Sequence, residues 1–410
     1  MTQMPFFSKE KSSKAKTAKR SGEENLLPVH KRFDISFSHG KGVYLFAKNQ
    51  KYLDFGAGIA VNALGHCHPS MVKAITKQAE KLWHVSNIYH INELEKCAKK
   101  LTDAYQKDYA FFCNSGAEAI ECVVKMIRKH FSSQGNPEKN RIITFSGAFH
   151  GRTITAISAA GKDKYYQGFE PLLEGFDNVE FGNIEAVKNA ITDRTAGILI
   201  EPIQGEEGIR VSSKEFIQEL RRISKEKGIL LAFDEVQCGM GRTGNLGAYE
   251  YYGVKPDIIA LAKAIGGGFP LGACLSSKFA AKGMGLGTHG TTYGGNPLAM
   301  AVANVILDNI AKPKFLKNIQ NVSKYLFDQL KLLQQEFPDK IDEIRGVGLM
   351  IGIKLNEKIV NTDFAALLIK NKLLTVGAGQ NVIRLLPPLN IEKKHVNIAI
   401  KILRKSLNQS

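Results

Sequence analysis

The hydrophobic positions of the chain alternate between helical spacing and short continuous runs over residues 70–311. Apolar residues within 72–82, and again within 120–127, recur at the spacing of one helix face. Between such stretches lie apolar runs short enough to be buried strands, which read YAFFC, RIITF, AGILIE, GILLAFDE and DIIALA. Runs that are apolar throughout and separated by helical crossovers predict a mostly parallel sheet covered by helices on both faces.

The two ends of the chain carry a different pattern. Apolar residues at 43–45 and 52–53 flank the polar segment 48–51, which predicts a short strand pair around a turn. Beyond Pro297 the spacing predicts longer helices near 297–311, 314–336 and 392–406, with one strand, IRGVGLMIGIKL, before the last helix. The pattern therefore predicts an α/β fold with a large domain and a smaller α+β domain. The predicted division is a disordered basic tail at 1–22, a segment of the small domain at 23–69, the large domain at 70–311 and the rest of the small domain at 312–410.

Composition narrows the class of protein. The 410 residues are 44% hydrophobic and 23% charged, which is ordinary for a water-soluble globular chain, and no uncharged apolar run is long enough to span a bilayer. Of the net charge of +17, residues 1–22 contribute +5 and residues 392–410 contribute +4, which leaves +8 on the body. Without a DNA-binding motif this excess favours anionic small molecules, and nucleic-acid binding is kept as an alternative.

The cysteines and histidines indicate a reduced protein without a metal. The six cysteines form no CxxC pair, which favours an intracellular and here a cytoplasmic location. The Lys- and Ser-rich start lacks the apolar centre of a secretory signal. In GHCHP, His66 and His68 have no further ligands at zinc-finger spacing, so a turn is favoured over a metal site.

Three ionisable residues, Glu201, Asp234 and Lys263, stand at the ends of predicted strands. Ligands of an open parallel sheet bind outside the carboxyl ends of its strands, so we expect these three side chains to approach one crevice. Lys263 lies in the apolar stretch DIIALAKAIGGGFP, where burial disfavours the charged amine and makes it nucleophilic towards carbonyl carbon. A lysine that extends from a strand end into water is the plainer interpretation of that segment alone.

Two glycine-containing segments compete as phosphate-binding loops. NSGAEA, at 114–119, joins a predicted strand to a helix, and its small residues leave backbone N–H groups free to bind an anion, although a plain helix cap is the alternative. GMGRTG, at 239–244, matches the GxGxxG fingerprint, but the residues after it lack helical periodicity, so a nicotinamide-dependent oxidoreductase is a remote alternative. An anion cradle, an acid for a protonated ring nitrogen and an amine for an aldehyde are the attachments that pyridoxal phosphate needs.

Eight segments in order resemble the class III, ornithine-type aminotransferases, which depend on pyridoxal phosphate. They lie between about residues 28 and 406 and read YLDFGAGIAVNALGHCHP, NSGAEA, FHGRT, EPIQGE, FDEVQCGMGRTG, AKAIGGGFPLGA, HGTTYGGNPLA and VIRLLPPL. The resemblance implies fold type I of the pyridoxal-phosphate transferases. It also implies transfer of the terminal amino group of N2-acetylornithine to 2-oxoglutarate in arginine biosynthesis. Ornithine, succinylornithine, succinyldiaminopimelate and 4-aminobutyrate are neighbouring substrates that the motifs barely separate.

The resemblance implies a role for each matching residue. Lys263 would condense with the aldehyde of the cofactor and then move the substrate proton, and Asp234 would pair with the ring nitrogen. The other cofactor contacts would be Ser115, Gly116 and Ala117 at the phosphate, Phe149 and Val236 on the two ring faces, Gln237 near the ring hydroxyl, and Thr292 from the neighbouring subunit of a homodimer.

Arg152 and Arg384 resemble the two carboxylate-binding arginines of the family. A planar guanidinium binds a carboxylate through two hydrogen bonds, and a transaminase accepts two substrates in one pocket, although a surface ion pair is the alternative for any one arginine. The resemblance implies that Glu201 pairs with Arg384 while the acylated diamine is bound and releases it for 2-oxoglutarate. The segment EEG at 206–208 departs from the more glycine-rich loop of the family, which leaves the acyl preference open.

Overall fold

The computed structural model describes residues 22–410, and its internal contacts divide the chain between Ser36 and Phe37. Within 22–36 the described chain has one short turn, the 3-10 helix η1 at Glu23–Asn25. The predicted disordered tail at 1–22 lies outside the described residues apart from Gly22, so it stays a prediction. All elements described below belong to residues 37–410.

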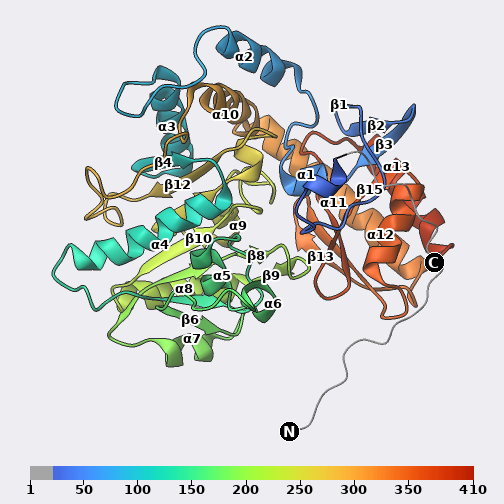
Figure 1. Cartoon of the computed structure of the whole chain (residues 1–410). Helices are drawn as coiled ribbons and strands as arrows, with labels where there is room; N and C mark the ends of the chain where they lie inside the picture. Colours follow the sequence, from blue (N-terminus) through green and yellow to red (C-terminus); the bar gives the residue numbers. More distant parts are fainter. Residues whose placement is uncertain (1–21) are drawn as a thin grey trace. The chain divides into compact units, whose positions relative to one another are not determined.

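A seven-stranded sheet forms the centre of residues 109–276 (Figure 1). Its strands are β4 Tyr109–Cys113, β5 Arg141–Phe145, β6 Phe176–Val179, β7 Thr195–Ile200, β10 Leu230–Asp234, β11 Ile258–Leu261 and β12 Gly272–Ser276. The order is β4-β12-β11-β10-β7-β5-β6, and the pairs from β11 to β6 are all parallel. Within this sheet, β12 alone is antiparallel to both of its neighbours. The predicted mostly parallel sheet is confirmed, and β6 and β12 are the two strands of this sheet that the sequence pattern did not predict.

Helices cover both faces of this sheet, because successive residues of a strand point to opposite sides. In β10, Leu230 lies in the core beneath α4, Gly116–Ser132, which crosses one face in Figure 1, and Leu231 lies in the core beneath α8, Lys214–Glu226. The other elements within residues 57–310 are α1 Ala57–Ala60, α2 Pro69–Ala79, α3 Asn92–Tyr105, α5 Ile154–Ala160, α6 Asp163–Tyr166, α7 Ile184–Ala190, β8 Ile203–Gln204, β9 Arg210–Val211, α9 Ala248–Tyr252, the 3-10 helix η2 Lys263–Ile265 and α10 Pro297–Ile310.

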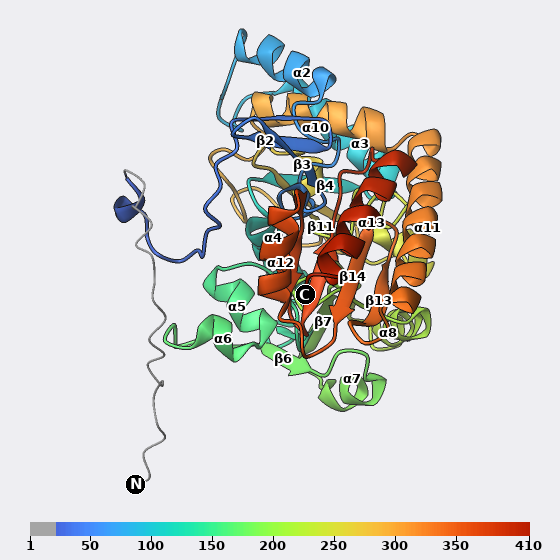
Figure 2. The same ribbon diagram turned by 90° about the vertical axis from the view of Figure 1, so that its right-hand side faces the viewer.

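A second group of elements combines the early hairpin with the C-terminal part of the chain (Figure 2). One four-stranded sheet has the order β1-β2-β3-β15 and the other has the order β13-β14-β17-β16. The early hairpin joins the C-terminal elements, as predicted, because Leu53 pairs with Leu373 in parallel strands. The domain boundaries themselves stay predictions. The elements are β1 His39–Lys41, β2 Tyr44–Ala47, β3 Gln50–Asp54, α11 Pro313–Glu336, β13 Ile341–Val347, β14 Met350–Leu355, α12 Asn361–Lys370, β15 Leu373–Leu374, β16 Val376–Ala378, β17 Val382–Leu385 and α13 Lys393–Leu407.

The segment IRGVGLMIGIKL was predicted as one strand, and that prediction is wrong. The chain reverses within it, so that Val347 of β13 lies opposite Met350 of β14. The turn depends on Gly348, whose φ of +61° is in the left-handed region, and a side chain there would lie 2.4 Å from the Arg242 carbonyl oxygen. The turn has no Asn, Asp or Pro, so the apolar pattern runs through it without a break.

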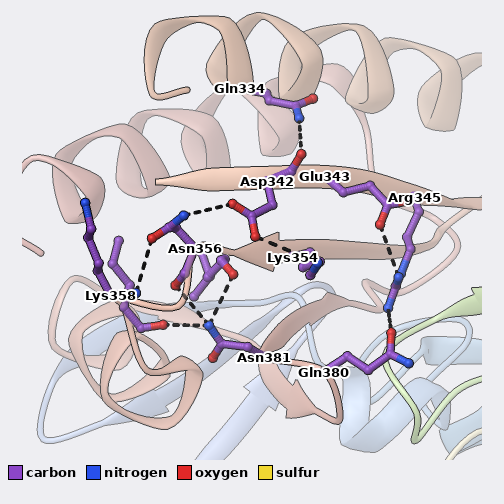
Figure 3. Close-up of polar contacts among 11 residues, drawn as sticks. Gln334, Asp342, Glu343, Arg345, Lys354, Asn356, Lys358, Gln380 and Asn381 are labelled. Carbon is purple, nitrogen blue, oxygen red and sulfur yellow. Dashed lines mark hydrogen bonds and ion pairs between the residues drawn. The ribbon is translucent and has the colours of Figure 1, made fainter. Parts of the chain in front are cut away.

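Polar side chains at the edge of this second group fix the entry to β17 (Figure 3). Asn381 Nδ2 donates to the carbonyl oxygens of Leu355, Asn356 and Ile359 at 3.2, 3.1 and 2.8 Å. Arg345 Nη2 donates to Gln380 Oε1 at 2.8 Å. These bonds hold the turn before β17, the strand that carries Arg384.

Candidate active site

A cavity of about 310 Å³ lies at the carboxyl ends of β7, β10 and β11, and sites for small molecules typically occupy roughly 300–1,000 Å³. The expectation that Glu201, Asp234 and Lys263 meet in one crevice is confirmed, because all three line this cavity. Most of the other residues predicted for the site line it too: Ser115, Gly116, Ala117, Phe149, Val236 and Gln237. Arg152, Arg384 and Thr292 are not among the lining residues.

Lys263 begins the short turn η2, and Ala262 alone separates it from the end of β11. Its φ of +48° lies in the left-handed region, which is uncommon for a residue with a side chain and is often found at functional sites. Burial lowers the pKa of Lys263; the Glu206 carboxylate opposes this shift and the Arg384 guanidinium adds to it. A larger share of neutral amine is therefore present at neutral pH than for an exposed lysine, which suits a nucleophile.

Asp234 is held from two sides in the interior. Its Oδ2 is 2.8 Å from His150 Nδ1, and its Oδ1 accepts a hydrogen bond from the Val236 N–H at 2.9 Å. Burial on its own would lower the pKa of His150, but the hydrogen bond and charge of Asp234 outweigh it, and the pKa is raised. His150 was not among the residues predicted for the site, although it lies in the FHGRT segment between Phe149 and Arg152.

The first turn of α4 reaches the cavity wall. Ser115 caps this helix, its Oγ accepting from the Glu118 N–H at 3.2 Å. A side chain at Gly116 would lie 2.9 Å from Val236 Cγ1, so glycine allows the helix start to pack against that wall. The free N–H groups of a helix N-terminus favour an anion such as phosphate. Together with the amine of Lys263 and the acid of Asp234, this cradle fits the three attachments of pyridoxal phosphate.

The predicted pairing of Glu201 with Arg384 is not what the structure contains. Glu201 Oε2 accepts the Phe149 N–H at 2.7 Å, and burial together with the charge of Asp234 raises the pKa of this carboxyl. Arg384 instead donates to Glu206, Nη1 to Oε1 at 2.6 Å and Nη2 to Oε2 at 3.2 Å. The path of the chain explains this difference. Glu201 directly follows β7, in the part of the cavity wall near Asp234. Glu206 lies in the turn between β8 and β9, beside β16 and β17, and its carbonyl oxygen accepts the Gly379 N–H at 2.9 Å.

Arg152 is held by aromatic rings. Its guanidinium carbon lies 4.3 Å from the centre of the Tyr165 ring and 5.6 Å from that of Phe149. The side chain is exposed, and among residues 22–410 it forms no ion pair with a carboxylate. A guanidinium supported on its faces keeps its N–H edge available for a carboxylate.

The other motifs have structural roles. In GMGRTG, Arg242 is fully buried and donates to the carbonyl oxygens of Leu349 and Pro387 at 3.2 and 2.5 Å. The next helix, α9, has five residues, too few for the long crossover helix of a dinucleotide site. In GHCHP, His66 Nε2 is 2.7 Å from Asp54 Oδ2. Within 22–410 no group of three or more His, Cys, Asp or Glu residues is arranged to hold a metal ion, and no helix there has the length and apolar character needed to cross a membrane.

Comparison with known proteins agrees with this site. The model of the family "Aminotransferase class-III" matches residues 28–407, so the chain belongs to the class III aminotransferases. Acetylornithine aminotransferase 1 of Bradyrhizobium diazoefficiens is 52% identical over 387 residues, which are 94% of this chain and 95% of that protein. These findings confirm the predicted family, fold type I and aminotransferase class, and with them the pyridoxal phosphate cofactor on which this class depends.

Two solved structures are also similar. That of N-acetylornithine aminotransferase from Stenotrophomonas maltophilia K279a has a TM-score of 0.81 and 36% identity, and covers 92% of this chain and 96% of that one. That of ornithine aminotransferase from Toxoplasma gondii has a TM-score of 0.89 and 30% identity, and covers 94% and 92%. The Toxoplasma gondii structure has pyridoxal phosphate at partial occupancy in its active site.

Proposed function

We propose that this chain transfers the terminal amino group of N2-acetylornithine to 2-oxoglutarate, giving N-acetylglutamate 5-semialdehyde and glutamate, as a step of arginine biosynthesis. The observation that carries the proposal is the convergence of Lys263, Asp234 and the start of α4 on one cavity. The choice of substrate is supported by the name of the relative that is 52% identical to this chain.

Lys263 and Asp234 are the proposed catalytic residues. When bound, pyridoxal phosphate supplies an aldehyde that takes up the amino group and a ring that accepts negative charge. Lys263, whose pKa is lowered by burial, would hold the aldehyde and would move a proton at the substrate carbon that carries the amino group. Asp234, whose Oδ2 lies 2.8 Å from His150 Nδ1, would keep a proton on the ring nitrogen. Ser115, Gly116 and Ala117 would hold the phosphate, Phe149 and Val236 would flank the ring, and Gln237 would contact the ring hydroxyl; all six residues line the cavity.

Arg152 and Arg384 are the proposed carboxylate ligands. Arg152 binds one carboxylate of either substrate, which its lack of a carboxylate partner supports. Arg384 binds the second carboxylate of 2-oxoglutarate, and Glu206, in place of Glu201, neutralises it while N2-acetylornithine is bound. Glu201 retains a place in the cavity wall beside Asp234.

We further propose a homodimer in which Thr292 reaches the phosphate of the partner subunit. Thr292 is exposed, and the segment that contains His84 and Asn87 lies beside its loop. Asn87 Nδ2 donates to the Gly294 carbonyl oxygen at 2.9 Å, and the His84 and Tyr293 rings lie 5.3 Å apart. Trp83, next to His84 in the chain, and Tyr293 are 65% and 63% exposed, and large exposed apolar side chains of this kind suit an interface. Light scattering of the purified protein tests this, and a fully active monomer would refute it.

A cytoplasmic location completes the proposal. Its support is the state of the cysteines: all six are unpaired and five are buried, which fits a reducing compartment. Fractionation of cells that express the full chain tests it, and recovery with secreted proteins would contradict it.

The decisive experiment joins cofactor chemistry to substrate choice. The purified protein, loaded with pyridoxal phosphate, is reduced with borohydride and digested, and we expect the cofactor on the peptide that contains Lys263; a label elsewhere rejects the assignment. The absorbance change of the unreduced enzyme is then compared for N2-acetylornithine, ornithine, succinylornithine, succinyldiaminopimelate and 4-aminobutyrate. N2-acetylornithine is expected to have the highest kcat/KM, and a higher value for another amine replaces the proposed substrate without affecting the chemistry.

A further inference from the structure

A second cavity, of about 740 Å³, lies apart from the Lys263 site and shares none of its lining residues. Two cysteines line it, Cys122 from α4 and Cys274 from β12, together with His289. Both cysteines are only 1% exposed, so the cavity is their route to solvent. Nothing in the proposed transamination uses these three residues.

The His289 ring is fixed in one orientation beside the thiols. Lys125 Nζ donates to His289 Nδ1 at 2.9 Å, and the Phe111 ring lies 4.5 Å from the imidazole. An ammonium group can only donate, so Nδ1 accepts and a neutral imidazole carries its proton on Nε2. His289 Nε2 is buried and has no hydrogen-bond partner of ordinary geometry among the described residues. This N–H is therefore available to a developing negative charge on the cavity wall.

The thiol of Cys122 differs from the other buried thiols. Burial raises the pKa of Cys97 to about 12 and also raises the pKa of Cys113 and Cys238. For Cys122, the neighbouring Cys274 thiol lowers the pKa, His289 and Lys125 lower it further, and burial does not cancel them. The pKa of Cys274 is raised by the same contact and by burial. The Cys122 sulfur is thus suited to attack as a thiolate, while the Cys274 sulfur remains a thiol.

We propose that Cys122 and Cys274 form an oxidisable dithiol, which a hydroperoxide such as hydrogen peroxide converts to an intramolecular disulfide. The Cys122 thiolate attacks one peroxide oxygen, the O–O bond breaks, and hydroxide leaves and takes up a proton as water; Cys122 becomes a sulfenic acid. The Cys274 sulfur then attacks the Cys122 sulfur, its proton leaves, and the sulfenic oxygen departs as a second water. The two sulfurs lose two electrons, which reduce the peroxide, and an external dithiol reverses the change.

The test uses the full-length protein with its cofactor bound, fully reduced and then treated with one equivalent of hydrogen peroxide. Remaining thiols are blocked with N-ethylmaleimide, and the digest is analysed without reductant by mass spectrometry. We expect a cross-linked peptide pair that contains Cys122 and Cys274, lost on addition of dithiothreitol. Cys67, which is exposed, is expected to remain available to the blocking reagent. Oxidation of Cys67 with Cys122 and Cys274 both unmodified would overturn the proposal.

Three variants separate the roles within the site. Cys274→Ser is expected to stop the reaction at a sulfenic acid on Cys122, which dimedone traps, and Cys97→Ser, a matched buried cysteine, is expected to leave the cross-link unchanged. His289→Gln is expected to slow oxidation of Cys122 roughly tenfold and to move its alkylation profile to higher pH, because the thiolate loses its support. A wild-type rate and pH profile in His289→Gln, or no dimedone adduct in Cys274→Ser, contradicts the mechanism.

Discussion

The two arginines proposed as carboxylate ligands lie in contrasting surroundings. Arg152 follows the cavity residues 149–151, is exposed and rests on the rings of Tyr165 and Phe149. Arg384 lies within β17, is 1% exposed and is bound through two nitrogens by Glu206. One guanidinium is supported without being neutralised, and the other is neutralised by a carboxylate of the same chain.

This difference indicates how one pocket accepts two substrates. An unpaired guanidinium is available to any carboxylate, whereas a paired one is released only to a ligand that outcompetes its internal partner. In the proposed function, a substrate with one carboxylate, bound at Arg152, would leave the pair of Arg384 with Glu206 intact, and a dicarboxylate would replace Glu206 at Arg384. Specificity then depends on the strength of an internal ion pair as well as on the shape of the pocket.

The largest expected effect concerns the internal pair itself. Glu206→Ala is expected to lower the free energy of unfolding by about 3 kcal/mol at neutral pH, because it leaves the Arg384 charge buried without its partner. Glu207→Ala is the matched control next in sequence, where loss of the partly exposed pair with Lys162 is expected to cost about 1 kcal/mol or less. Equal losses in the two variants, measured by urea unfolding, would remove the distinction between a buried and a peripheral pair.

The same pair gives a pH dependence with a definite sign. Burial on its own would raise the pKa of Glu206, but Arg384 outweighs it, and the folded-state pKa is lowered. The stabilisation is therefore complete above the unfolded value of about 4.3 and is lost as the pH falls through the lower folded value. The difference in unfolding free energy between wild type and Glu206→Ala is expected to shrink only below about pH 4. If this difference in unfolding free energy already shrinks between pH 7 and about pH 4, another titrating group is responsible.

Arg152→Lys is expected to lower kcat/KM about 100-fold in both half-reactions, because lysine cannot bind a carboxylate through two N–H groups or stack on Tyr165. Stopped-flow absorbance measures each half-reaction separately. A loss confined to one half-reaction would mean that Arg152 does not serve both substrates.

Arg384→Lys is the matched substitution at the second proposed carboxylate ligand. It is expected to lower kcat/KM about tenfold with 2-oxoglutarate only. The half-reaction with N2-acetylornithine is expected to stay near wild type, since Arg384 is then paired with Glu206. Comparable losses in both half-reactions would show that the two arginines are not specialised.

The smallest expected effect concerns the aromatic support of Arg152. Tyr165→Leu is expected to raise KM for both substrates about threefold through loss of the cation–π contact, and Tyr165→Phe, which keeps the ring, is expected to leave KM unchanged. A larger effect in Tyr165→Phe would assign the role to the hydroxyl instead.

The sequence alone predicted those parts of the site that follow from strand ends and local motifs. Glu201, Asp234 and Lys263 could be placed together because carboxyl ends of parallel strands share one edge, and the start of α4 was visible in the spacing of NSGAEA. The partner of Arg384 was assigned wrongly, because the choice between Glu201 and Glu206 depends on how the β8–β9 turn approaches β17, a contact between residues far apart in the chain. His150 was missed for the same kind of reason, since its bond to Asp234 joins positions 84 residues apart.

The antiparallel direction of β12 determines how the loop that contains Lys263 is connected to the sheet. Because β11 and β12 are antiparallel neighbours, the loop 262–271 that holds Lys263 leaves and re-enters the sheet at the same edge, as in a hairpin, without a crossover helix. Both ends of the loop 262–271 are joined to adjacent strands, so this loop could be replaced as a unit by the corresponding loop of a relative. Directed recombination at the two strand ends would then vary the surroundings of the amine while leaving the scaffold intact.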